Sequence, residues 1–66
     1  MITQEQENTI EDCLREAQSK IEEAARLLCS EPGDSVGGEM YRTCYKMAEN
    51  MIPELIHNAY KLVLES

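Results

Sequence analysis

The sequence predicts an all-α protein, an antiparallel hairpin of two helices that dimerises into a four-helix bundle. Three observations point to this fold. Apolar residues recur at helical spacing in both halves of the chain, and a segment rich in proline and glycine separates the halves. The chain has only 66 residues, too few to bury a large core without a second copy or a covalent staple. We expect residues 1–66 to form a single domain.

The first helix is expected from about residue 4 to about residue 29. Thr3 and Gln6 match a capping box at its start, and Glu11 with Arg15 places an acid before a base on its polar side. Its apolar positions step by four and three residues, as in a coiled-coil seam: Ile10, Leu14, Ala17, Ile21, Ala24 and Leu28. This seam spans about 100° of the helix surface, which suits a single neighbouring helix or the groove between two.

The segment 30–38, with the sequence SEPGDSVGG, is predicted to be the loop. Pro32 stops the first helix, and Asp34 or Ser35 can cap the next one. Gly37 and Gly38 are poor helix formers. We therefore expect this segment to be the most mobile part of the chain outside the termini.

Ser35 also lies in a GDSVG pentapeptide, which matches the G-x-S-x-G pattern of a hydrolase nucleophile. That chemistry needs a strand before the serine, a histidine base and an oxyanion hole. The sequence shows no strand pattern, and its single histidine, His57, lies far along the second helix. We expect Ser35 to be a helix cap and the protein not to be an enzyme.

The second helix is expected from about residue 39 to about residue 65. Its apolar residues before and after Pro53 share one arc of about 180°, so the sequence favours a continuous helix with a kink near Pro53 over two separate helices. A lone hairpin cannot cover an arc this wide, and an obligate homodimer through the second helix would cover it. The residues expected at this interface are Met40, Tyr41, Cys44, Tyr45, Met47, Ala48, Met51, Ile52, Leu55, Ile56, Ala59, Leu62 and Val63.

The three cysteines indicate a reducing compartment. The chain has an odd number of cysteines, Cys13, Cys29 and Cys44, and contains no C-x-x-C pair. Neither a disulfide framework nor a zinc site is therefore indicated. The sequence has no signal-peptide pattern and no apolar run of about 18 residues. We expect a cytoplasmic protein with no membrane segment.

The charge balance favours protein partners. Thirteen acidic residues against six basic ones give a net charge of −7, which disfavours binding to nucleic acid. We expect the protein to act by protein–protein interaction, as an adaptor or regulator, with a second copy of itself as the first partner. An acidic inhibitor that mimics nucleic acid and blocks a basic site is an alternative that uses the same charge.

A dimeric metal-binding bundle is the other alternative. Glu54 and His57 form a Glu-x-x-His pair of the kind that supplies ligands in di-iron four-helix bundles, and a dimer contains this pair twice. Glu11 or Glu16 would add a carboxylate from the first helix. However, His57 falls on the polar face, and Glu7 is the one carboxylate within the seam of the first helix. We therefore expect no metal and no other cofactor.

Overall fold

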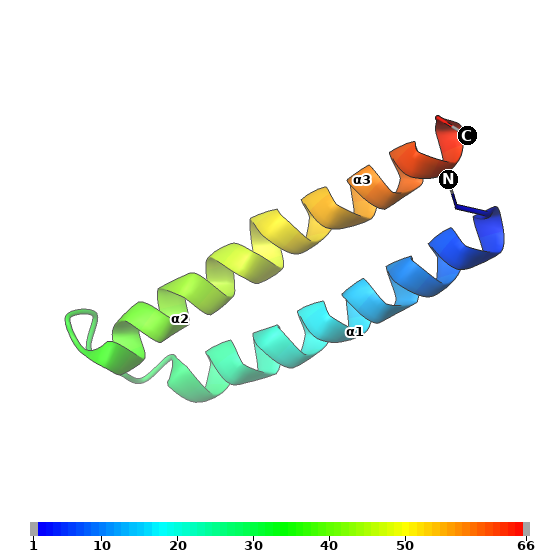
Figure 1. Cartoon of the computed structure of the whole chain (residues 1–66). Coiled ribbons are helices and arrows are strands. Elements are labelled where there is room, and N and C mark those ends of the chain that lie inside the picture. Colours follow the sequence, from blue (N-terminus) through cyan, green and yellow to red (C-terminus); the bar gives the residue numbers. More distant parts are fainter. Residues whose placement is uncertain (1, 66) are drawn as a thin grey trace.

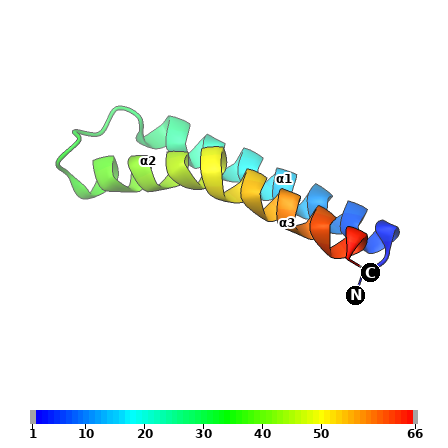
Figure 2. The same cartoon turned by 90° about the horizontal axis from the view of Figure 1, so that it is seen from above.

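Two long antiparallel helical arms joined by one loop make up the structure, a computed structural model that describes residues 2–65. The first arm is α1 (Gln4–Leu28). The second arm runs through α2 (Val36–Lys46), a π-helical turn η1 (Met47–Met51) and α3 (Ile52–Leu64). Both termini lie at one end and the loop at the other (Figure 1), and the arms stay side by side in the perpendicular view (Figure 2). The predicted all-α hairpin is confirmed.

The start of α1 is fixed by a reciprocal cap. The Thr3 hydroxyl accepts a hydrogen bond from the Gln6 backbone N–H at 3.1 Å, and the Gln6 side chain accepts one from the Thr3 backbone N–H at 3.0 Å. This is the capping box that the sequence predicts. The first turn of α1 is therefore held in place, which matters below for the buried side chain of Glu7.

The loop is shorter than the sequence suggests. Ser35 caps α2 as predicted, because its hydroxyl accepts from the Gly38 N–H at 3.0 Å and donates to the Pro32 carbonyl at 2.7 Å. The Arg42 guanidinium donates to the Gly33 carbonyl and ties the loop to the second turn of α2. The second arm consequently begins at Val36, three residues before the expected start near residue 39.

Gly38 explains why glycine is needed here. Its backbone is buried, and a Cβ atom at this position would lie 2.0 Å from the Pro32 carbonyl oxygen and 2.8 Å from the Gly33 Cα. The missing side chain lets the loop backbone cross directly over the first turn of α2. Gly38 thus serves the close approach of the two backbone segments, and the mobility expected for residues 30–38 stays a prediction.

Pro53 is accommodated by the π-helical turn. The Ile52 N–H donates to the Met47 carbonyl, five residues back, and the proline nitrogen carries no hydrogen. The Ala48 carbonyl therefore receives no donor from either residue. The Gln18 side chain of α1 fills this position, donating from Nε2 at 2.7 Å. The second arm continues across Pro53 as expected, and the wider π-helical turn before the proline accommodates it.

The core between the arms consists mainly of small residues. The buried apolar side chains are Ala25, Ala48, Ile52 and Ala59. Because Gln18 bonds to Ala48, the antiparallel register places Ala25 level with Tyr41 and Glu7 level with Ala59. Alanines at the line of contact let two helices approach closely, but they bury little apolar surface.

We expect Gln18→Ala to lower the free energy of unfolding by about 1–2 kcal/mol, because the Ala48 carbonyl loses its donor. Pro53→Ala restores a backbone N–H near that carbonyl, so the cost of Gln18→Ala should be clearly smaller in the Pro53→Ala chain. Urea unfolding of the four chains at one protein concentration, followed by circular dichroism, measures both costs. Equal costs in the two backgrounds would contradict the link between Pro53 and Gln18.

We expect Gly38→Ala to lower the free energy of unfolding by about 2 kcal/mol or more, because its methyl group overlaps backbone atoms of Pro32 and Gly33. Gly37→Ala is the matched control. The atoms nearest its methyl group belong to the exposed side chain of Glu31, which can rotate away, and alanine has the higher helix propensity by about 1 kcal/mol. Thermal unfolding should rank Gly38→Ala well below Gly37→Ala, and the reverse order would contradict the packing.

Candidate interaction surface

The second arm carries two apolar lines, one residue apart, and only one of them faces α1. The inner line is buried or half-buried and consists of Tyr41, Ala48, Ile52, Ile56, Ala59 and Val63. The neighbouring positions form what we call the outer stripe: Met40, Cys44, Met47, Met51, Leu55, Asn58 and Leu62. Met40, Met51 and Leu55 of this stripe expose 51%, 50% and 47% of their surface. Asn58 and Leu62 are also exposed, whereas Cys44 and Met47 are half-buried. The outer stripe is thus a mainly apolar row that the hairpin covers only in part.

The first arm also leaves its apolar seam half-covered. All six predicted seam residues, Ile10 to Leu28, are only half-buried. The fully buried positions of α1 are Glu7 and Ala25, at the edge of the seam. The second arm therefore contacts α1 off-centre, and the middle of the seam stays open to a further helix.

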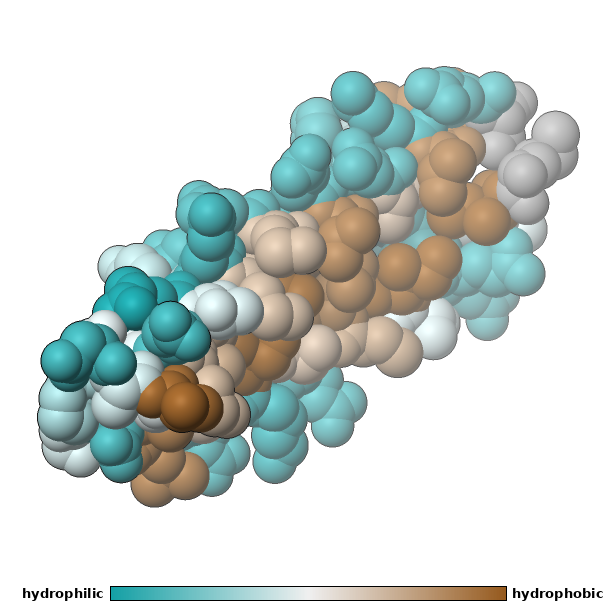
Figure 3. Space-filling model, turned by 60° about the vertical axis from the view of Figure 1, so that its left-hand side comes forward, coloured by the Kyte–Doolittle hydropathy of each residue, from teal (hydrophilic) through white to brown (hydrophobic). Residues whose placement is uncertain are grey.

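Both uncovered lines lie on the same side of the hairpin. On the opposite side, a groove of about 220 Å³ is lined by Glu22, Arg26 and Cys29 of α1 and by Tyr45 and Glu49 of the second arm, among others. Around each helix axis, these residues lie on one side of the line of contact, whereas the α1 seam and the outer stripe lie on the other. We call the seam and the outer stripe together the apolar face. Figure 3 shows a continuous apolar band along the molecule, bordered by hydrophilic side chains.

The predicted interface residues are therefore divided by the structure. Six form the inner line within the hairpin, six belong to the outer stripe, and Tyr45 lines the groove. The wide apolar arc is evident from the sequence, but the sequence does not indicate which half of the arc faces α1. Ala48 and Ala59 allow the close approach of α1 and Ile52 is buried with them, whereas Met40, Met51 and Leu55 stay about half-exposed.

The groove on the opposite side was missed from the sequence. Tyr41 and Tyr45, four residues apart, place their ring centroids 6.3 Å from each other along its wall. Glu22, Arg26 and Glu49 also line it, and none of them forms an ion pair within residues 2–65. The sequence signal for this groove is the pair of tyrosines four residues apart on one helix. The groove has room for one apolar side chain of a partner.

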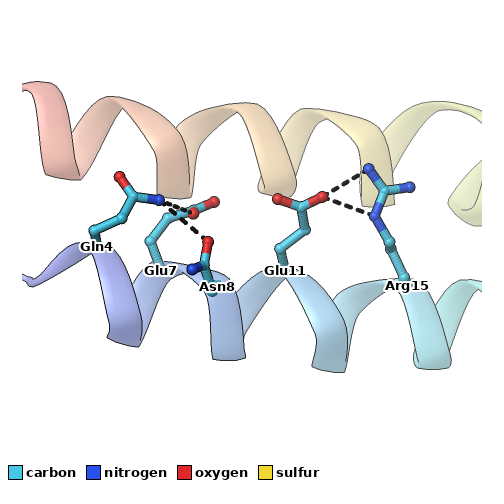
Figure 4. A network of polar contacts seen from close by, with 5 residues as sticks. All are labelled: Gln4, Glu7, Asn8, Glu11 and Arg15. Carbon is cyan, nitrogen blue, oxygen red and sulfur yellow. Dashed lines mark hydrogen bonds and ion pairs between the residues drawn. The ribbon is translucent and has the colours of Figure 1, made fainter.

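Glu7 is the most buried side chain, with 2% of its surface exposed. Gln4 donates to its Oε2 at 3.1 Å and also to the Asn8 side chain, whereas Glu7 Oε1 has no hydrogen-bond partner in the described part of the chain (Figure 4). One turn further on, Glu11 and Arg15 form the predicted pair at 2.7 Å on the exposed side. A buried carboxylate with one unpaired oxygen weakens the end of the hairpin where it lies.

The candidate chemical sites of the sequence are not assembled. Glu54 and His57 are exposed on α3, and within residues 2–65 no three His, Cys, Asp or Glu side chains gather as a metal site. Ser35 and His57 lie on one continuous arm, about 30 Å apart along its axis. Cys13 and Cys29 are exposed, Cys44 is half-buried, and all three are free thiols.

Comparison with known proteins adds no family to this description. No protein-family model, curated protein or solved structure matches the chain. Within residues 2–65, no helix combines the length and the apolar character needed to cross a bilayer.

We expect Glu7→Leu to raise the free energy of unfolding by about 1 kcal/mol or more, because leucine removes a buried, half-satisfied carboxylate and buries apolar surface in its place. Glu16→Leu is the control, since Glu16 is an exposed carboxylate on the same helix. This substitution should change the free energy of unfolding by no more than about 0.5 kcal/mol. Chemical denaturation at a fixed chain concentration compares the two. A destabilised Glu7→Leu chain would show that Glu7 has a partner which the isolated chain lacks.

Proposed function

We propose that this protein acts by protein–protein interaction, as an adaptor or regulator built on an obligate homodimer, and that the second arm holds the two copies together. The observation that carries the proposal is the uncovered outer stripe, in which Met40, Met51 and Leu55 are each about half-exposed. Soluble chains seldom leave a row of large apolar side chains in water along a whole helix. A second copy brings an identical row to cover it.

The surface area supports the same proposal. The chain exposes 4960 Å², whereas a typical folded monomer of this mass exposes about 4,200 Å². The excess of roughly 700 Å² is close to the area of about 800 Å² that one partner buries in a standard interface. The hairpin is 46 Å long and only 12 Å across in its thinnest direction, so packing a second hairpin on its side is the direct way to reduce this area.

The distribution of charge agrees with a central position for the second arm. Within Val36–Leu64, three carboxylates are balanced by three basic residues, whereas Gln4–Leu28 contains seven carboxylates and three basic residues. Two neutral arms meet without net repulsion, and the acidic α1 helices then lie toward solvent at the sides. The free cysteines fit a reducing cytoplasm, where we place the protein.

We expect light scattering to give about twice the chain mass of 7.5 kDa at micromolar concentration. Met51→Asp should abolish assembly and most of the helical circular dichroism together, because it places a charge in the interface. Leu27→Asp is the control: Leu27 is 79% exposed and lies away from the apolar face, so its variant should remain a folded dimer. A wild-type chain that is stably folded as a monomer would overturn the proposal.

A further inference from the structure

We infer that the second copy packs antiparallel along the outer stripe, with the two-fold axis at Met51 and each Cys44 facing the partner's Asn58. This inference rests on the proposed homodimer and adds its orientation and register. It follows from the spacing of the stripe, from the nature of the side chains at each level, and from the charges of the two halves of the arm.

The spacing of the outer stripe reads the same in both directions. From Met40 to Leu62 its positions step by four, three, four, four, three and four residues, and Met51 is the central member. An antiparallel copy centred on Met51 therefore brings each stripe position beside the position equally far from Met51 in the partner's sequence. The π-helical turn lies on the Met47 side of Met51 alone, so the two halves of the stripe differ slightly in length and in angle around the arm. The levels are Met51 with the partner's Met51, Met47 with the partner's Leu55, Cys44 with the partner's Asn58, and Met40 with the partner's Leu62.

The side chains at these levels suit each other. Apart from the Cys44 level, each level pairs a flexible methionine with an apolar residue, and thioethers adapt readily to the shape of a neighbour. Asn58 is the one amide in the stripe, and its amide meets the Cys44 thiol, which is a weak donor and acceptor. A single amide at a fixed level disfavours registers in which it would face a large apolar side chain.

The charges of the arm favour antiparallel over parallel packing. Val36–Lys46 carries one carboxylate and two basic residues, whereas Met47–Leu64 carries two carboxylates and one basic residue. Antiparallel packing places the positive half of each arm beside the negative half of its partner, and it also opposes the two helix dipoles. Parallel packing would bring like halves together. The antiparallel dimer has its loops at opposite ends and leaves both tyrosine-lined grooves on its outside.

The inference is tested by disulfide trapping. The background chain carries Cys13→Ser and Cys29→Ser, which leaves Cys44 as its sole thiol. Adding Asn58→Cys should give a covalent dimer on a non-reducing gel after treatment with oxidised glutathione, which takes up the two electrons as two thiols become one disulfide. The two positions lie about 21 Å apart within one helix, so the bond cannot form inside a chain.

Two controls fix the orientation. The background chain should stay uncross-linked, because the two Cys44 residues of an antiparallel dimer lie about 21 Å apart along the axis. The chain with Asn58→Cys and Cys44→Ser should also stay uncross-linked for the same reason. Cross-linking in either control would place the two identical cysteines side by side, which overturns the register centred on Met51 while leaving the proposed dimer intact.

A second level keeps the test independent of one variant. Met47→Cys and Leu55→Cys, each made in a chain with all three native cysteines changed to serine, should cross-link when mixed and refolded together, and neither should do so alone. Light scattering of every variant accompanies the gels. A dimer that cross-links at neither level contradicts the register, whereas a folded monomer contradicts the proposed function itself.

Discussion

The missing N–H of Pro53 is the constraint on which the rest of this hairpin depends. It leaves the Ala48 carbonyl without a donor from its own helix, since Ile52 has turned to Met47 in the π-helical turn. Gln18 of the other arm supplies that donor. A buried carbonyl is costly to leave unpaired, so this bond selects one register of the two arms over those shifted by a turn. In this register alanines lie along the line of contact, and the arms approach closely.

Close approach along alanines has a consequence for the outside of the molecule. The hairpin packs on Ala25, Ala48 and Ala59 together with Ile52. The methionines and leucines of the outer stripe lie one residue away from this line of contact, and most of them stay exposed. The same rotation leaves the α1 seam half-covered on the same side. One face of the hairpin therefore collects the apolar surface that two helices alone cannot bury.

Features set by neighbouring residues were predictable from the sequence, and those set by contacts between the arms were not. The capping box at Thr3, the Ser35 cap and the long helices depend on side chains within one turn, and the structure has all of them. Hydropathy could not decide which half of the wide arc faces α1, because both halves are apolar and both contain large side chains. Helix propensity predicted the start of α2 too late in the chain. It includes the cost of a glycine within a helix, but it does not include the Pro32 carbonyl, which occupies the space that a side chain at position 38 would need.

The two faces of the hairpin differ in what they can recognise, and this difference links the dimer to an adaptor role. The apolar face is mainly aliphatic side chains at a symmetric sequence spacing, which suits an identical partner. The groove on the other side has two tyrosine rings, two carboxylates and one arginine within a short distance along the arms. Aromatic and charged side chains of this kind give specificity to protein interfaces, whereas a plain apolar row gives stability. The proposed dimer through the apolar face would therefore use the less selective surface for assembly and would display the more selective one, twice, to other proteins.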